Sequence, residues 1–575
     1  MIGKIESIEG NLVTVKLGIN IENTASIVNL HVVFSSQNEV MVGEILSTSK
    51  THAKIALIGE LINNSFVSGV NKKPSFASTV RIINKNELDL VLGNSSSNNA
   101  FNLGRIPLYS NYLLNVNPNN LYSNHFCILG NSGAGKSCSV ARMFQNLFIN
   151  KRPKSNIFIF DVFGEYARAL KGVNNISFKS FTTNKEDTDS LLINLPIWLL
   201  DVDDLALLLD AESYIQIPII EKALKIVSVY SMDEEQKEKA ITDIIASAIL
   251  DILYSGKSAP QIRDQVIAIL SAYGTKTLNL NTSVIVPGWT RTLKQCLILD
   301  KDGKINEMQL VTEFIAKYTG SGIELNMPQG KIYYTLENLY NAFDLAFISE
   351  GILKSDAIFD KVNVLKSRLK TIIDSSYGDF FRSDTYITRE DYIRNLNDDG
   401  KYNIVNFNIN SITDRQAKAI IKIYSRLLLE YNQKLQDRGT HPIHIFIEEA
   451  HRYIQNDRDI DLIGYNIFEK IAKEGRKYAV IMGLITQRPS ELSNTALSQC
   501  ANYVIFRIIN PADLSYLSNI VPNVSEEVMS KIKSLQAGYA LAIGTAFKTP
   551  VVVKFDLPNP MPYSENVNLD NTWYN

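Results

Sequence analysis

The sequence has few cysteines, no long apolar run and almost no net charge. Its four cysteines (Cys127, Cys138, Cys296 and Cys500) are scattered over 575 residues without a CxxC pair, which disfavours a disulfide scaffold or a zinc module. No stretch approaches the roughly 18 consecutive apolar residues of a membrane span, and the first residues lack a signal-peptide pattern. Lysine and arginine number 58 against 60 aspartate and glutamate residues, which disfavours a generally basic, nucleic-acid-coating surface. We therefore expect a cytoplasmic protein without membrane contact.

Hydrophobic patterning divides the chain into several parts. Short apolar runs punctuated by glycine fill the first hundred residues and predict a small antiparallel β-barrel, which the polar stretch Gly93–Asn99 would end. From His125 a strand-like run, a glycine-rich turn and a helical pattern follow, an order that indicates a parallel α/β sheet. Helical periodicity dominates from about Leu195 to Arg394, so we expect a helical insertion. Further strand-like runs are Asn156–Phe160, Tyr402–Phe407, His444–Ile447, Ala479–Thr486 and Tyr503–Arg507.

The strongest motif is a phosphate-binding loop. Residues 130–137 have the sequence GNSGAGKS and match GxxxxGK[ST] in full. The glycines let the backbone wrap a phosphate with its N–H groups pointing inward, while Lys136 reaches the β- and γ-phosphates and Ser137 places a hydroxyl on Mg²⁺. The alternative is a glycine-rich turn without a ligand, which the strand and helix predicted on either side disfavour. The predicted nucleotide-binding residues are Gly130, Asn131, Ser132, Gly133, Ala134, Gly135, Lys136, Ser137 and Cys138.

Acidic residues follow two of the apolar runs. Glu448 and Glu449 come directly after the run that ends at Ile447, the arrangement of a Walker-B segment. We expect Glu448 in the Mg²⁺ shell, together with the Ser137 hydroxyl, and Glu449 polarising the attacking water. The alternative is a charged strand terminus, and Glu448 stands where aspartate is usual.

A second acidic motif, DVFGEY, begins at Asp161. The carboxyl ends of parallel strands line the ligand crevice of such a sheet. Asp161 and Glu165 could therefore face the γ-phosphate or Mg²⁺. The alternative is an acidic turn that caps the next helix.

Two polar residues further along the chain complete the predicted site. Gln487 ends another apolar run, where an amide can sense the γ-phosphate or orient water. Arg476, within EGRK, could act across a subunit boundary as an arginine finger; a solvated basic face is the alternative. His451 follows the glutamate pair and could orient it by hydrogen bonding.

As a set, these motifs resemble those of the HerA family of ATPases, within the FtsK/HerA group. The matching segments are GNSGAGKS, DVFGEY, IFIEEAH, EGRKYAV, LITQRPSELS and LSQCANYVIFRI. The resemblance implies an α/β fold built on a RecA-like P-loop ATPase core. The implied parts are an N-terminal β-barrel (1–95), the first part of the core (100–196), a helical insertion (197–394), the second part of the core (395–556) and a tail that braces a neighbouring subunit (557–575).

The resemblance also implies a function. Family members form homo-hexameric rings that hydrolyse ATP with Mg²⁺ at subunit interfaces and move double-stranded DNA through a central pore. Glu449, Gln487 and Arg476 would be the catalytic acid/base, the γ-phosphate sensor and the trans-acting arginine. A partner effector, either a nuclease or a sirtuin-like NAD-consuming protein, is implied in anti-phage defence or DNA end processing. Asn124 stands where the family often has arginine, which leaves Arg105 as a substitute candidate.

Two other functions are open at this point. A nucleotide-gated ring scaffold could control an effector enzyme without processive translocation, because the barrel and tail suit protein contacts and no basic stripe is evident. A small-molecule P-loop kinase would have little use for a barrel and a helical insertion. For the translocase, candidate pore segments are the loop Gln455–Asp461 and the basic helix Arg415–Lys422, since a pore needs lysine and arginine facing DNA.

Overall fold

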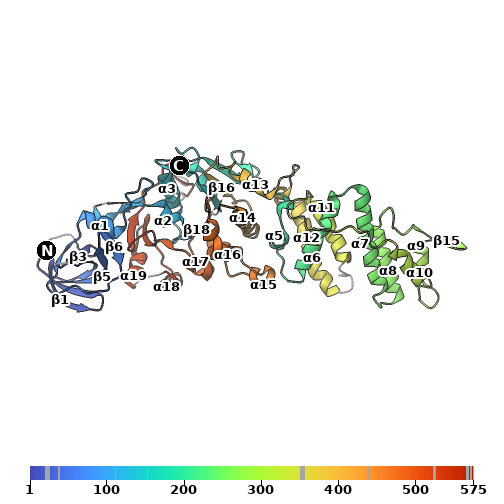
Figure 1. Ribbon diagram of the computed structural model, residues 1–575, viewed down its shortest axis with the longest axis horizontal. Coiled ribbons are helices and arrows are strands. Elements are labelled where there is room, and N and C mark those ends of the chain that lie inside the picture. The colour runs from blue at the N-terminus through green and yellow to red at the C-terminus, as the bar shows by residue number, and fades with distance from the viewer. Residues whose placement is uncertain are drawn as a thin grey trace.

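The chain is elongated, with a small barrel at one end, a large sheet in the middle and a helical arm at the other end (Figure 1). The computed structural model describes all residues except 20–25, 37–38, 111, 152, 350–355, 438, 522–525, 565–568, 570–572 and 574–575. Among the described residues, no helix is long and apolar enough to cross a membrane.

The N-terminal strands form the predicted barrel. In the described residues it runs β2-β1-β7-β3-β4-β5, and pairing of β2 with β5 closes it, while β6 extends β5 as a hairpin. Alternation explains this fold, because Val13 and Val15 point into the barrel while Thr14 and Lys16 lie on its outer side. The strands are β1 (Gly3–Glu9), β2 (Leu12–Leu17), β3 (His31–Ser35), β4 (Val40–Thr48), β5 (His52–Ile62), β6 (Ser65–Ser68) and β7 (Thr79–Ile82), followed by helix α1 (Lys85–Leu92).

The central sheet has twelve strands in the described part of the chain. Their order is β13-β12-β16-β11-β17-β18-β10-β19-β20-β21-β8-β9. The strands from β13 to β19 are parallel, as predicted, and the remaining four are antiparallel. The bounds are β8 (Phe101–Ile106), β9 (Tyr112–Val116), β10 (Phe126–Leu129), β11 (Asn156–Asp161), β12 (Phe178–Thr182), β13 (Leu191–Leu192), β16 (Ile404–Asn408), β17 (Ile443–Ile447), β18 (Val480–Thr486), β19 (Asn502–Phe506), β20 (Tyr539–Gly544) and β21 (Val551–Lys554).

Both faces of this sheet are buried, which explains the unbroken apolar runs in its parallel strands. Phe126 and Ile128 of β10 pack in the same cluster as Phe144 of α3, whereas Cys127 and Leu129 join the core on the opposite face. The helices in this part of the chain are α2 (Pro118–Tyr122), α3 (Lys136–Phe148), α4 (Tyr166–Leu170), α14 (Asp414–Lys434), α15 (Asp459–Ile463), α16 (Ile467–Glu474), α17 (Asn494–Ser498), α18 (Pro511–Ile520) and α19 (Glu526–Ser534).

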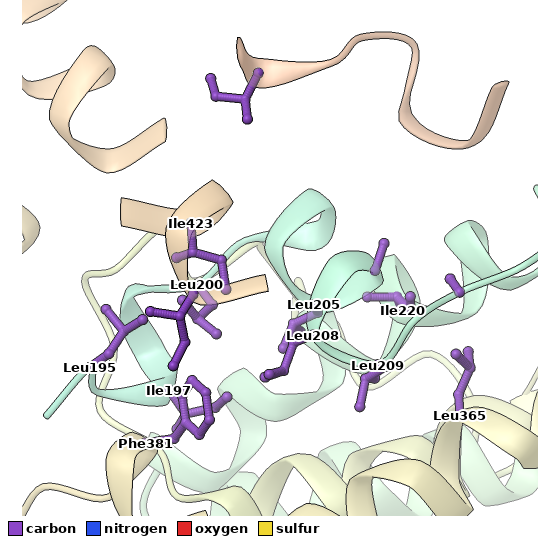
Figure 2. Close-up of a cluster of buried hydrophobic side chains, with 14 of the residues drawn as sticks. Leu195, Ile197, Leu200, Leu205, Leu208, Leu209, Ile220, Leu365, Phe381 and Ile423 are labelled. Carbon is purple, nitrogen blue, oxygen red and sulfur yellow. The ribbon is translucent and has the colours of Figure 1, made fainter. Parts of the chain in front are cut away.

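The arm lies between β13 and β16 in the sequence and is mainly helical. Its base packs on the central domain in one apolar cluster, where Leu200 lies beside Ile423 of α14 (Figure 2). A short hairpin, β14 paired with β15, was not predicted from the sequence. The elements are α5 (Val202–Leu208), α6 (Gln216–Val227), α7 (Glu234–Leu253), α8 (Ala259–Tyr273), β14 (Ser283–Val286), β15 (Trp289–Thr292), α9 (Leu293–Cys296), α10 (Met308–Ala316), α11 (Leu336–Ser349), α12 (Asp356–Asp374) and α13 (Arg389–Leu396).

The two candidate pore segments contact each other instead of presenting free charges. Lys418 and Lys422 of α14 both pair with Asp457, and Lys422 also pairs with Asp459. Lys422 is only 2% exposed. These lysines are therefore neutralised within the chain, and the expectation that they face DNA loses its basis.

A buried arginine joins the same helix to the arm. Arg426 of α14 donates from Nε to Asp204 Oδ1 of α5 at 2.7 Å, and both side chains are buried. Removing one partner of such a pair leaves an uncompensated charge in a low-dielectric interior.

We expect Arg426→Ala to lower the free energy of unfolding by about 3–5 kcal/mol, because Asp204 stays buried without its partner. The matched control is Lys434→Ala on the same helix, whose pair with Glu390 is exposed and contributes at most about 1 kcal/mol. Urea unfolding followed by circular dichroism measures both, and equal losses in the two variants would contradict this assignment.

Candidate nucleotide-binding site

Four neighbouring parallel strands end at one edge of the central sheet and carry most of the predicted site. Leu129 of β10 is in register with Thr486 of β18, and Phe160 of β11 with Ile447 of β17. The loop 130–137, Asp161, Glu448, Glu449 and Gln487 each follow or end one of these strands. The topology therefore brings together every predicted site residue except Arg476.

The loop 130–137 depends on glycine at two close approaches. A Cβ on Gly130 (φ 155°) would lie 2.5 Å from Phe506 Cβ, and one on Gly135 (φ 104°) would lie 3.1 Å from the backbone nitrogen of Gly538. The Gly538 N–H donates to the Ala134 carbonyl at 2.9 Å. The loop is thus fixed between β19 and the start of β20 in a left-handed conformation that larger residues do not adopt.

Lys136 is buried inside this loop. Its Nζ donates to the carbonyl oxygens of Gly130 at 2.8 Å and Asn131 at 3.1 Å. Burial lowers the pKa of Lys136, while the charges of Glu449, Glu448 and Glu165 raise it. The ammonium group therefore lies between loop carbonyls and acidic side chains, at the position where phosphate oxygens would replace the carbonyls.

Glu448 is buried among other acidic groups. Tyr166 Oη donates to Glu448 Oε1 at 3.3 Å, while Oε2 has no hydrogen-bond partner in the described structure. Burial raises the pKa of Glu448 well above its ordinary value, and the nearby charges of Asp161, Glu165 and Glu449 add to the effect. An orphaned buried oxygen of this kind is a position that a cation would satisfy.

Glu165 joins the predicted metal ligands. Burial raises the pKa of its carboxyl, and the neighbouring Ser137 side chain lowers it. The described residues contain no preformed group of three or more metal-binding side chains. The oxygens of Ser137, Glu165 and Glu448 nevertheless suit Mg²⁺, which prefers carboxylate and hydroxyl oxygens and is usually completed by water and phosphate.

Asp161 fits the capping alternative better than direct contact with a phosphate or metal ion. It is fully buried, and its two oxygens accept from the backbone N–H groups of Glu165 and Tyr166, both at 3.0 Å. Asn406 Nδ2 donates to it at 3.3 Å. Because its oxygens are occupied in this way, Asp161 shapes the turn that positions Glu165.

Glu449 has a strained backbone and contacts two of the other predicted residues. Its φ is +46°, a left-handed conformation that costs a non-glycine residue of the order of 1–3 kcal/mol and is common at functional sites. Its carboxylate contacts the Gln487 side chain, and burial raises its pKa while Lys136 lowers it. His451 Nδ1 lies 3.2 Å from Glu449 Oε2 and 3.0 Å from Thr486 Oγ1.

Arg476 lies at the amino-terminal ends of the parallel strands, opposite the ends that carry the phosphate loop. It belongs to the short turn Gly475–Tyr478 that precedes β18, whereas Gln487 follows that strand. Its charge acts on His125 at the start of β10, where burial and Arg476 together lower the pKa of His125 to about 4. Seven strand residues separate the two ends by roughly 20 Å, so Arg476 does not reach the phosphate loop of its own chain.

The other arginine candidate is also remote from the loop. Arg105, on β8, pairs with Asp556 at 3.0 Å, and three strands lie between β8 and β10, the strand that leads into the loop. Asn124 contacts the Ser123 hydroxyl at 3.4 Å. Arg105 therefore does not reach the phosphate loop of its own chain, and Asn124 has no charge to contribute.

Sequence analysis missed two residues that act on the glutamate pair. Tyr166 donates to Glu448, and the charge of Arg452 lowers the pKa of Glu449. Tyr166 is the last residue of the motif DVFGEY, and Arg452 directly follows the motif IFIEEAH. The contact of Tyr166 with Glu448 follows from the strand order and is not visible in the sequence, whereas Arg452 is only three residues from Glu449.

Comparisons with known proteins support the family resemblance. A family model described as "Helicase HerA, central domain" matches residues 101–318. The "DNA double-strand break repair helicase HerA" of Sulfolobus acidocaldarius is 30% identical over 222 residues, which cover 38% of this chain and 41% of that protein. The protein of the same name from Pyrococcus furiosus is 22% identical over 460 residues, covering 80% and 69%. The predicted resemblance to the HerA family is confirmed.

Solved structures include distant neighbours. The bacterial conjugative coupling protein TrwB, without its first 70 residues, aligns over 84% of this chain and 94% of that one, with 11% identity and a TM-score of 0.45.

We expect Glu448→Gln to stabilise the protein when no nucleotide or Mg²⁺ is present. A carboxyl whose folded-state pKa is raised binds its proton more tightly when folded, so its contribution to stability falls as pH rises through the unfolded and then the folded pKa. The melting temperature of the variant should therefore exceed that of the wild type by more at pH 8 than at pH 5.5. The exposed Glu324→Gln is the control, and a pH-independent or negative difference for Glu448→Gln would contradict the raised pKa.

Proposed function

We propose that this chain is an ATPase of the HerA type that assembles into a hexameric ring and translocates double-stranded DNA. One observation carries the proposal. The phosphate loop, the glutamate pair and Gln487 meet at one edge of the sheet, while Arg476 lies at the opposite edge. Such a site is completed by a second subunit, as in a ring where each interface holds one nucleotide.

The geometry supports hydrolysis of ATP. The loop N–H groups and Lys136 bind the phosphates, with Lys136 exchanging its bonds to loop carbonyls for bonds to phosphate oxygens. Ser137, Glu165 and Glu448 would hold Mg²⁺, which supplies charge neutralisation when bound. Gln487 orients the attacking water, and Glu449 accepts its proton, a task that its raised pKa suits. The neighbour's copy of Arg476 neutralises charge on the transferring phosphoryl group.

The proposed domains serve this motor. The parallel strands and their helices form a RecA-like core (100–196 and 395–556), the arm (197–394) is inserted into it, and the barrel (1–95) is the docking platform for an effector. The relatives are named DNA repair helicases, which supports DNA as the substrate. We infer that the effector is a nuclease or a sirtuin-like protein, in anti-phage defence or DNA end processing.

A nucleotide-gated scaffold is the second candidate. Pairing of Lys418 and Lys422 with Asp457 removes the charges that the sequence offered for a DNA pore. A ring without a basic pore would assemble and control the effector and would hydrolyse ATP slowly. DNA dependence of ATP turnover separates the two candidates.

Long linear duplex DNA should raise ATP turnover, and DNA binding should weaken steeply as salt increases, because phosphate contacts release counterions. Lys136→Ala should abolish turnover, and Glu449→Gln should reduce it at least about 100-fold while nucleotide still binds. Turnover that ignores DNA of every length would overturn the translocase in favour of the scaffold.

Mixing two inactive variants tests the shared site. Arg476→Ala and Glu449→Gln should each be inactive alone, whereas a 1:1 mixture should regain activity. Random assembly places an intact Glu449 beside a neighbour's intact Arg476 at about a quarter of the interfaces. The control for subunit exchange is a mixture of Arg476→Ala with Lys477→Ala, a variant in which every proposed site residue is intact. If mass measurement detects mixed rings but the first mixture stays inactive, a trans-acting Arg476 is excluded.

A further inference from the structure

The end of the described C-terminal tail runs along its own chain toward the phosphate loop. Residues 557–564, here called the tail strap, follow β21 and lie against α3 and α4. The backbone N–H of Asn559 donates to Gln145 Oε1 at 2.9 Å, and Gln145 Nε2 donates to the Pro560 carbonyl at 3.0 Å. Gln145 therefore fixes the start of the strap on the C-terminal part of α3.

Arg168 of α4 fixes the next part of the strap. Its Nε donates to the Met561 carbonyl at 2.8 Å, and its Nη2 donates to the Pro562 carbonyl at 3.2 Å. The same guanidinium group lies 4.6 Å from the centre of the Tyr563 ring. One side chain thus holds both the backbone and the aromatic ring of the strap.

The strap ends beside the phosphate loop. The Tyr563 N–H donates to the Glu165 carbonyl at 3.0 Å, and Ser564 Oγ lies 3.5 Å from Cys138 Sγ. Cys138 follows Ser137 directly in the first turn of α3. The last strap residues therefore lie at the mouth of the candidate nucleotide site of the same chain.

The orientation of a bound nucleotide follows from the loop. Leu129, which leads into the loop, is paired with Thr486, which directly precedes Gln487, so the γ-phosphate end lies on that side. The backbone N–H groups at the start of α3 hold the α- and β-phosphates. A nucleoside attached to the α-phosphate therefore leaves the loop past Cys138, where Ser564 and Tyr563 are.

We propose that Tyr563, held by Arg168, is the wall on which the purine base of the bound nucleotide stacks. This inference rests on the proposed nucleotide-binding function and adds the residue that recognises the base. Tyr563 is 60% exposed although the peptide group that precedes it is held by hydrogen bonds to Glu165 and Arg168. A fixed aromatic ring with an open face, backed by a guanidinium group, is a stacking platform for a planar base.

Stacking without hydrogen bonds to base edges discriminates weakly between purines. ATP and GTP should therefore bind with similar affinity, and both should bind more tightly than inorganic tripolyphosphate, which has no base.

Calorimetric titration with a non-hydrolysable ATP analogue and with tripolyphosphate tests the inference. Tyr563→Ala should weaken analogue binding at least about 5-fold, the lower limit for loss of one base–aromatic stack, and leave tripolyphosphate binding unchanged. Tyr563→Phe keeps the ring and should bind like the wild type. Tyr214→Ala removes another exposed tyrosine, 75% exposed, from the helical arm and is the matched control.

The outcomes separate this inference from the proposed function. Unchanged analogue binding by Tyr563→Ala overturns the stacking wall, and so does an equal loss of tripolyphosphate binding, which would indicate a structural role. If Lys136→Ala still loses both ligands, the phosphate loop assignment stands in either case. A wild-type protein that binds neither ligand overturns the proposed function together with this inference.

Discussion

The site depends on one electrostatic constraint, the burial of several carboxylates beside a single lysine. Glu165, Glu448 and Glu449 are withdrawn from water around Lys136, and burial raises the pKa of each carboxyl. Only part of this charge is compensated within the chain, since one oxygen of Glu448 has no described partner and Lys136 bonds to loop carbonyls. A nucleotide with Mg²⁺ would supply the missing cation, and its phosphate oxygens would bind Lys136. The free protein thus holds a destabilised, preorganised site, as expected where binding energy is used for catalysis.

The parallel sheet also separates Arg476 from this local arrangement. Strands β10, β11, β17 and β18 deliver their carboxyl ends to the same edge, and any residue that precedes one of them lies at the other edge. Arg476 is such a residue, about one strand length from Gln487. The tail strap, in contrast, contacts the region of the phosphate loop within its own chain. We infer that the phosphates and the base bind largely to residues of one subunit, whereas the arginine that completes the catalytic site comes from a neighbouring subunit.

Much of this arrangement was predictable, because parallel strands buried on both faces leave unbroken apolar runs and the phosphate loop has a fixed spacing. Two features were not. Lys422 lies in a basic, helical segment that resembles a solvated face, and its burial against Asp457 and Asp459 depends on a contact between distant segments. The contact of Ser564 with Cys138 joins residues 426 positions apart, and local spacing carries no information about such a contact. Asp161 shows a third limit of prediction. An aspartate that directly follows a strand can be a metal ligand or a helix cap, and the sequence does not distinguish the two roles.

The central claim is that the ATP site is complete only between subunits. The most direct test is ATP turnover per subunit over a wide range of protein concentration, with the mass of the particle measured under the same conditions. The account predicts that turnover per subunit falls toward zero as rings dissociate on dilution, in parallel with loss of the hexamer mass. Monomers that hydrolyse ATP at the full rate would contradict it.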